Sequence, residues 1–219
     1  MRAMKKYELV IFDMDGTILY TLTDIVNGLN YALKKNHYPE RTQEQVRKFI
    51  GNGIRHEVIH SLPKDVSEDV IDQVFDDFNE YYAVHCGDTT RPYEGVVELI
   101  EKLNQNGILT AVVSNKGDYA VQQLMEQYFP KLFKMGVGEK KGVRRKPYPD
   151  TVNEVLKALD IKCENAVYIG DSEVDIETAK NASMDGIIVE WGYRDHDFLV
   201  EHGAQVLVKD VEELKNILL

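Results

Sequence analysis

Two acidic residues, Asp13 and Asp15, directly follow an apolar run at residues 9–12 and are followed by Gly16 and Thr17. Two carboxylates this close in sequence repel each other, and no cation adjoins them in the chain. The pattern is typical of a strand end that holds a divalent metal ion and a phosphoryl group, with one carboxylate as nucleophile and the other as acid/base. For this segment alone, a strand followed by an Asp-Gly turn is the structural alternative.

Three further polar clusters lie at the ends of predicted strands or in the loops beyond them. They are Ser114-Asn115-Lys116, Arg144-Arg145-Lys146-Pro147, and the run from Gly170 through Asp171 to Asp175. Taken alone, the first cluster fits a helix cap, the second a solvated basic patch and the third a turn. Their joint occurrence is much harder to explain by structure alone. Because ligands bind at the carboxyl ends of strands in open parallel sheets, we expect the four clusters to meet at one site.

Short apolar runs alternate with amphipathic helical patterns along most of the chain. This alternation predicts an α/β fold, a doubly wound (Rossmann-like) parallel sheet with helices on its faces. The predicted strands are Glu8–Phe12, Leu109–Val113, Ala166–Ile169, Gly186–Val189 and Val206–Val208. The predicted helices are Gly95–Asn106, Tyr119–Tyr128, Pro149–Leu159, Val174–Asn181 and Val211–Leu218.

Residues 21–88 break the alternation, because they carry helical patterns and no convincing strand. Thr42 and Gln45 predict a capping box, and Ser67 predicts the start of a helix with a long apolar face. We therefore predict two domains: a Rossmann-like catalytic core of residues 1–20 and 89–219, and an inserted all-helical cap of residues 21–88.

Composition limits the partners. The formal net charge is −11 and the sequence pI is near 5.0, which argues against nucleic acid and against an anionic membrane surface. Cys86 and Cys163 form no zinc or disulfide pattern. The basic start at residues 1–6 precedes an apolar run too short for a signal peptide, and no stretch predicts a membrane span. These features predict a cytoplasmic protein and do not exclude a small anionic substrate. We further expect a monomer or weak dimer, and the arrangement of Asp13 and Asp15 indicates that its partner is a small phosphorylated metabolite.

The four clusters together resemble the signature motifs of the haloacid dehalogenase (HAD) superfamily of phosphotransferases. The likeness covers essentially the whole chain, and the insert resembles the C1-type cap of that family. Within the superfamily, the chain is most similar to phosphoglycolate phosphatases. That narrower likeness is carried by Ile50–Arg55, Arg91–Val96 and Val113–Lys116.

The resemblance implies a Mg²⁺-dependent phosphatase that works through an aspartyl-phosphate. Asp13 would attack phosphorus, and Asp15 would protonate the leaving oxygen and then activate water. Phosphoryl oxygens would be bound by Ser114, by Lys146 and by the backbone N–H groups of Met14, Asp15 and Asn115. The metal ligands would be the Asp13 carboxylate, the Asp15 carbonyl and the Asp171 carboxylate. Asp175 would hold metal-bound waters or orient Lys146.

The cap would determine which substrate the protein binds. The Gly51-Asn52-Gly53 loop allows backbone to approach a small ligand, and Arg55 and Lys116 are candidates for its non-phosphate end. The resemblance makes 2-phosphoglycolate the expected substrate. Tyr20 occupies a position that relatives often fill with Asp, which weakens that assignment. The basic run at residues 139–145 adds positive potential that would suit pyrophosphate.

Other functions on the same scaffold stay open. An inorganic pyrophosphatase or a sugar phosphomutase would use the same four motifs, because cap contacts and the lifetime of the intermediate decide the outcome. A signalling module resembling a response-regulator receiver is disfavoured, because receivers have no helical cap after the first strand. A dehalogenase is disfavoured because that chemistry needs neither a metal nor an acid at Asp15.

Overall fold

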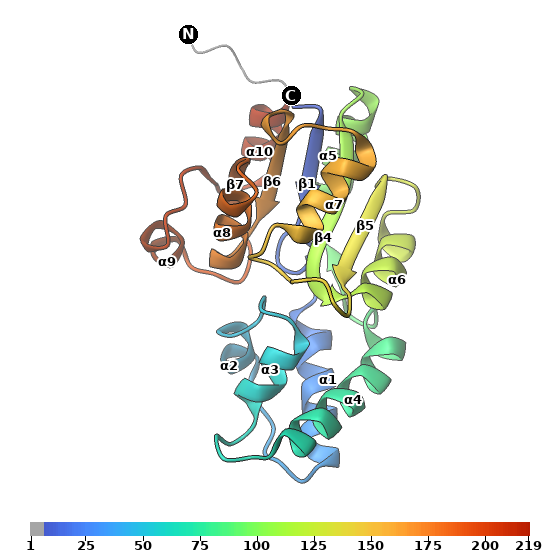
Figure 1. Ribbon diagram of the computed structural model, residues 1–219, viewed down its shortest axis with the longest axis vertical. Coiled ribbons are helices and arrows are strands. Elements are labelled where there is room, and N and C mark those ends of the chain that lie inside the picture. The colour runs from blue at the N-terminus through green and yellow to red at the C-terminus, as the bar shows by residue number, and fades with distance from the viewer. Residues whose placement is uncertain (1–6) are drawn as a thin grey trace.

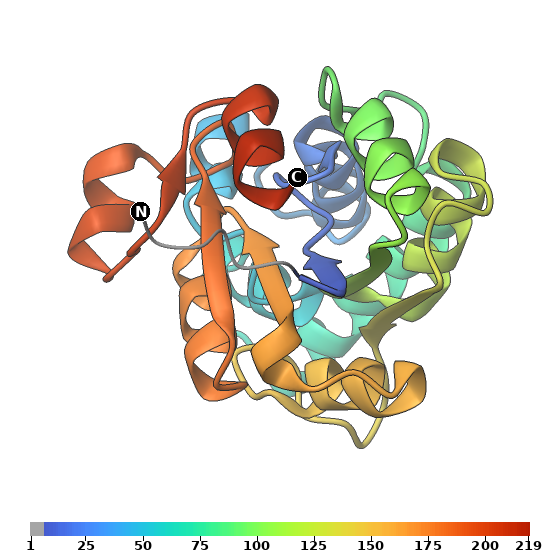
Figure 2. The same cartoon turned by 90° about the horizontal axis from the view of Figure 1, so that it is seen from above.

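The fold is built on a six-stranded parallel sheet with strand order β5-β4-β1-β6-β7-β8 (Figures 1 and 2). The computed structural model describes residues 7–219; residues 1–6, which the sequence assigns to the core, lie outside this part. The strands are β1 (Leu9–Phe12), β4 (Leu109–Gly117), β5 (Met135–Glu139), β6 (Ala166–Gly170), β7 (Asp185–Val189) and β8 (Leu207–Val208). The predicted doubly wound α/β fold is confirmed.

Helices bury both faces of the sheet, as the uninterrupted apolar run of β1 requires. Val10 and Phe12 pack in one hydrophobic cluster with α5, α6 and α10, whereas Leu9 and Ile11 pack in a second with α7 and α8. The bounds are α5 (Val96–Gln105), α6 (Asp118–Tyr128), α7 (Asp150–Leu159), α8 (Glu173–Asn181), α9 (His196–Glu201) and α10 (Val211–Leu218). Among residues 7–219, no helix has both the length and the apolar character needed to cross a membrane.

A separate helical layer lies beyond the carboxyl ends of the strands (Figure 1). It consists of α1 (Leu22–Lys35), α2 (Gln43–Arg47), α3 (Ile54–Ser61) and α4 (Glu68–His85), and α1 packs along α4. The predicted capping box is confirmed, since Gln45 N–H donates to Thr42 Oγ1 at 3.2 Å and Thr42 N–H to Gln45 Oε1 at 2.9 Å. Ser67 precedes α4, but its side chain makes no capping hydrogen bond.

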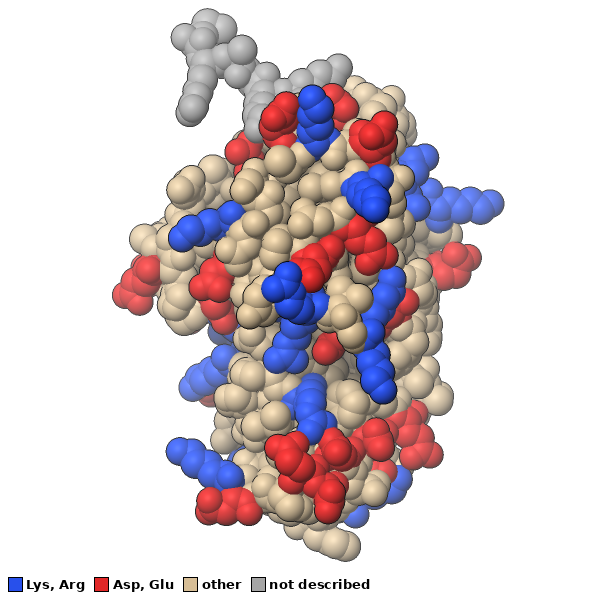
Figure 3. Space-filling model, viewed as in Figure 1, with Lys and Arg blue, Asp and Glu red and all other residues tan. Residues whose placement is uncertain are grey.

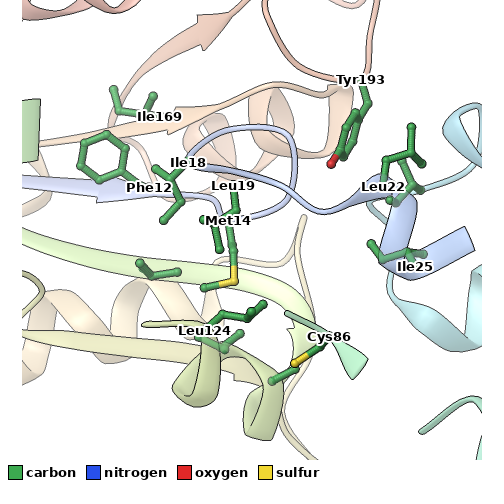
Figure 4. Close-up of a cluster of buried hydrophobic side chains, with 14 of the residues drawn as sticks. Phe12, Met14, Ile18, Leu19, Leu22, Ile25, Cys86, Leu124, Ile169 and Tyr193 are labelled. Carbon is green, nitrogen blue, oxygen red and sulfur yellow. The ribbon is translucent and has the colours of Figure 1, made fainter. Parts of the chain in front are cut away.

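One hydrophobic cluster continues from the sheet into the helical layer, as Figure 4 shows. Phe12 and Ile169 lie at the sheet end, and Leu22 and Ile25 of α1 lie at the other. Met14, from the loop after β1, lies between them and is fully buried. The loop that carries the first acidic pair is therefore fixed by burial of its apolar residues.

Four elements, β2 (Leu19–Tyr20), β3 (Arg91–Pro92), β5 and α9, are not predicted by the sequence analysis. Strand β5 has no continuous apolar run, because Gly138 lies so close to the backbone of Asp118 that an added Cβ would collide with it. The antiparallel pair of β2 and β3 has too few residues for a pattern, and so does α9.

The chain passes from the sheet to the helical layer before α1 and returns before β3, and Asp24 joins these two connections by hydrogen bonds. This buried carboxylate accepts hydrogen bonds from the backbone N–H and the hydroxyl of both Thr89 and Thr90, at 2.6–3.1 Å. A buried carboxylate is tolerated only where donors surround it, and here the donors come from the returning chain. Asp24 therefore fixes the start of α1 against the segment that leads to β3.

Replacing Asp24 with Ala is expected to lower the free energy of unfolding by about 3 kcal/mol, because the buried donors of Thr90 and the part-buried donors of Thr89 lose their acceptor. Asp24→Asn keeps one acceptor oxygen and should cost about half as much. Urea unfolding of both variants measures this. An unchanged midpoint for Asp24→Ala would contradict the structural role of this carboxylate.

Candidate active site

The carboxyl ends of three adjacent strands bring the polar clusters together. Asp13 follows β1, Asp171 follows β6, and Ser114 to Lys116 lie in the last part of β4; β1 runs between the other two strands. The pairing of β4 with β5 changes register at this point. Val113 faces Val137 and Gly117 faces Glu139, so β4 has extra residues between these pairs. The irregularity frees the Ser114–Lys116 segment to face the site.

A tight turn orients the first acidic pair. The Met14 carbonyl accepts hydrogen bonds from the N–H groups of Ile18, at 3.1 Å, and Leu19, at 3.0 Å. Gly16 has a φ of +84°, and a Cβ at this position would collide with the Asp171 carboxylate. Only glycine allows the turn to pass this close to the acid that follows β6.

Lys146 lies at the centre of the site. Its Nζ is 2.8 Å from Asp13 Oδ1 and 2.7 Å from Asp175 Oδ1, and it donates to the Tyr168 hydroxyl at 2.9 Å. Burial disfavours the charged ammonium, but the Asp13 and Asp175 carboxylates hold the pKa of Lys146 well above its usual range. Burial, opposed by Lys146, raises the pKa of Asp13 to about 7. Lys146 thus forms ion pairs with two buried carboxylates at once.

Asp15 is held by a second buried lysine. Lys116 Nζ donates to Asp15 Oδ1 at 2.9 Å and to Oδ2 at 3.1 Å, and it lies 4.8 Å from the centre of the Tyr82 ring. The Lys116 side chain is 1% exposed and that of Asp15 is 14% exposed. The Asp15 carboxylate is therefore held in a fixed position and remains partly exposed.

The residues present fit a divalent cation. Carboxylate oxygens of Asp13, Asp171 and Asp175 all lie within 4.8 Å of one another, and all three residues are buried. Burial, with Asp175 and Asp13 nearby, raises the pKa of Asp171 well above its usual range, which reflects uncompensated negative charge. Carboxylate and carbonyl oxygens are the ligands Mg²⁺ prefers.

Both carboxylate oxygens of Asp175 already accept hydrogen bonds from other groups of the protein. Its Oδ2 accepts from Ser172 Oγ at 2.6 Å and from the N–H groups of Asp171 and Ser172, and its Oδ1 contacts Lys146. Asp175 therefore caps α8 and orients Lys146. Asp13 and Asp171 keep more of their oxygen lone pairs available for a cation.

The second cluster links the site to the helical layer. Asn115 Nδ2 donates to the carbonyls of Gly51 and Lys146, both at 3.0 Å, and Asn115 Oδ1 accepts from Lys146 N–H at 2.8 Å. Ser114 Oγ accepts from Lys116 N–H at 3.2 Å. Asn115 thus links the Gly51–Gly53 loop of the helical layer to the segment that carries Lys146.

The motif residues open on a cavity of about 20 Å³, room for about one water molecule. It is lined by Asp13, Asp15, Gly51, Gly53, Ile54, Glu57, Ser114, Asn115 and Lys116. A phosphomonoester is much larger, so this closed arrangement of the two layers has no room for a whole substrate molecule. A larger cavity of about 740 Å³ lies along α5 and α10, but no residue of the four polar clusters lines it.

Arg194 holds the helical layer in this closed position. Its guanidinium donates to the carbonyls of Arg47, at 2.9 Å, and Ile50, at 2.8 Å, just before the Gly51–Gly53 loop. Glu173 balances its charge through a 2.7 Å hydrogen bond from Nε. The carbonyls on one side and the carboxylate on the other satisfy a buried arginine that spans the two layers.

Several sequence candidates lie outside the cavity. Arg55 pairs with Glu68, at 2.7 Å, and with Asp72 on α4, so its charge is balanced within the helical layer. Asn52 is also absent from the cavity lining. In the basic run, Arg144 pairs with Asp150 and Arg145 lies 3.9 Å from Glu139. Figure 3 shows basic side chains gathered where the two layers meet on this face.

Sequence reasoning missed Glu57, Tyr168 and Arg194. Glu57 has a sequence signal, because it lies three residues after Ile54 and one before Val58, on the buried face of α3. A charged residue on an apolar helical face indicates a buried polar site. Tyr168 lies within an apolar strand and Arg194 in a loop, and neither position shows a pattern.

Comparison with known proteins agrees with this geometry. Residues 10–189 match the family described as haloacid dehalogenase-like hydrolase. The phosphoglycolate phosphatase of Vibrio parahaemolyticus is 28% identical, over 96% of this chain and 95% of that protein. The N-acetylmuramic acid 6-phosphate phosphatase of Pseudomonas aeruginosa is also 28% identical, over 98% and 97%.

A solved structure gives the same result. A protein from Lactobacillus delbrueckii subsp. bulgaricus, provisionally named a phosphoglycolate phosphatase, superposes with a TM-score of 0.92 at 40% identity, covering 98% of this chain and 99% of that one. The resemblance drawn from the four motifs is thereby confirmed. With its sheet, its helical layer and the family match over residues 10–189, the chain belongs to the haloacid dehalogenase-like hydrolases.

Proposed function

We propose that this protein is a Mg²⁺-dependent phosphatase that hydrolyses a small phosphomonoester through an aspartyl-phosphate on Asp13. The observation that carries the proposal is the 2.8 Å pairing of Asp13 with the buried Lys146, together with a second carboxylate, Asp15, which lines the same cavity as Asp13. Asp13 Oδ1 contacts the lysine, which leaves Oδ2 to attack phosphorus. Phosphatase relatives of similar length support the reaction class.

The other residues act around this attack. Asp15, held by Lys116, donates a proton to the leaving oxygen and later takes one from water. Ser114 Oγ, with the backbone N–H groups of Met14, Asp15 and Asn115, binds phosphoryl oxygens, and Lys146 neutralises their charge. Mg²⁺ held by Asp13, Asp171 and the Asp15 carbonyl would screen the repulsion between carboxylate and phosphate. Asp175 keeps Lys146 in position.

The substrate we propose is 2-phosphoglycolate. Relatives named as phosphoglycolate phosphatases support it. Within the cavity, Gly51, Gly53 and Lys116 would contact the non-phosphate end. Residues 1–20 and 89–219 would form the catalytic core and residues 21–88 the cap. By the same proposal, the protein acts in the cytoplasm as a monomer or weak dimer.

Phosphate release with Mg²⁺ tests the substrate across 2-phosphoglycolate, pyrophosphate, N-acetylmuramic acid 6-phosphate and β-glucose 1-phosphate. We expect kcat/KM for 2-phosphoglycolate to exceed the others by at least about tenfold. Preference for pyrophosphate would favour a pyrophosphatase. Conversion of β-glucose 1-phosphate to an isomer without phosphate release would favour a mutase.

A further inference from the structure

Glu57 is a buried acid that the proposed reaction does not use. It lies on α3, which faces the carboxyl ends of the strands (Figure 1), and it is 3% exposed. Its Oε1 accepts a long hydrogen bond, 3.4 Å, from Gly51 N–H, whereas its buried Oε2 has no hydrogen-bond partner among residues 7–219. A buried polar atom without a partner is rare in a folded protein, and such atoms often mark a ligand site.

The cavity around Glu57 is the one into which the substrate must bind. Glu57 lines it together with Asp13, Asp15 and Lys116. Since Asp15 is to protonate the leaving oxygen, the carbon bonded to that oxygen must lie beside Asp15. Lys116 contacts both Asp15 oxygens, and an ammonium group has a third proton to donate. The rest of the leaving group therefore lies within reach of Lys116 and Glu57.

We propose that the Glu57 carboxyl group donates a hydrogen bond from Oε2 to a carboxylate on the leaving group, and that Lys116 holds the same carboxylate by its charge. This inference rests on the proposed function and adds a substrate-binding residue to it. It assigns the carboxylate contact to Glu57 and Lys116 in place of Arg55, which is paired on α4.

The protonation of Glu57 supports this direction of donation. Burial, with the charge of Asp15, raises the pKa of Glu57 to about 8; Glu139 also raises it and Lys116 lowers it. The carboxyl group is therefore mostly neutral at neutral pH. Because Oε1 accepts from Gly51, the proton belongs on Oε2. A hydroxyl donor and an ammonium that converge on one small cavity recognise an anion.

Two esters that differ only in the carboxylate test the proposal. Ethyl phosphate has a methyl group where 2-phosphoglycolate has its carboxylate. We expect Glu57→Leu to reduce the preference for 2-phosphoglycolate, measured as the ratio of the two kcat/KM values, roughly ten- to hundredfold. Glu57→Gln keeps an N–H donor and should hold this ratio within about threefold.

Arg55→Ala is the matched control, since Arg55 lies on the same helix and is the competing candidate. We expect it to change the ratio less than about threefold, because its charge is engaged by Glu68 and Asp72. A large loss of preference in Arg55→Ala, with none in Glu57→Leu, would assign the carboxylate to Arg55 and overturn the proposal.

Three other results would also overturn it. Equal losses for both esters in Glu57→Leu would show that Glu57 only closes the cap. A gain for 2-phosphoglycolate would show that Glu57 repels anions. A wild-type enzyme without preference between the esters would show that no carboxylate is read, while the phosphatase reaction itself would stand. By contrast, an absence of Asp13-dependent release from either ester would overturn the proposed function.

Discussion

Asp13→Asn is expected to reduce kcat for phosphate release at least about thousandfold, because an amide cannot form the aspartyl-phosphate. The fold should persist. Lys146 would keep its 2.7 Å contact with Asp175, and its hydrogen bond to Tyr168, after the Asp13 charge is removed. The loss should appear with every substrate, because each one must form the same aspartyl-phosphate.

The matched control is Asp150→Asn. Asp150 starts α7 and pairs with Arg144 outside the cavity, so its replacement should leave kcat within about twofold. Thermal unfolding of Asp13→Asn checks that the protein is folded. Residual activity above a tenth of the wild-type value would mean that Asp13 is not the nucleophile.

Removal of divalent metal should have the second largest effect. Chelation with EDTA is expected to abolish turnover and Mg²⁺ to restore it, because Asp13, Asp171 and Asp175 crowd negative charge that Lys146 alone balances poorly. Mg²⁺ should also raise the unfolding temperature in the absence of substrate, since a ligand that binds only the folded state stabilises it.

Asp171→Asn tests the metal site directly. It should raise the Mg²⁺ concentration needed for half-maximal stabilisation at least about tenfold, through loss of a charged oxygen ligand. Asp150→Asn again serves as the control and should keep the wild-type Mg²⁺ dependence. Undiminished hydrolysis in EDTA, or a Mg²⁺ effect that survives Asp171→Asn, would argue against this site.

The sequence contained enough to predict the sheet and the meeting of the four clusters. Apolar runs such as residues 9–12 are buried on both faces, so their composition alone identifies them as central strands. The order of strand and helix then fixes which ends of the strands meet. Asp13, Ser114 and Asp171 are brought together for that reason, and their roles in the reaction stay predictions.

The contacts that the sequence did not predict depend on how the elements pack against one another, above all where the helical layer meets the sheet. The Arg194 contact with Arg47 and Ile50 uses backbone carbonyls, which have no side-chain pattern. The pairing of Arg55 with α4 depends on the angle at which α3 packs. Strand β5 was missed because close packing against α6 selects glycine over the apolar residues by which strands are recognised.

The joint at Asp24 has an evolutionary consequence. Because β2 pairs with β3 and Asp24 binds Thr89 and Thr90, the inserted helices leave and rejoin the sheet at one closed junction. Loop-closure entropy grows slowly with length, about 0.6 kcal/mol for each doubling, so a change in the length of the insert adds little to the cost of closing the junction. Helices in this segment can therefore lengthen, shorten or be exchanged while β1 and β4 stay paired. Such a junction lets the insert change without altering the strand ends that carry Asp13, Ser114 and Asp171.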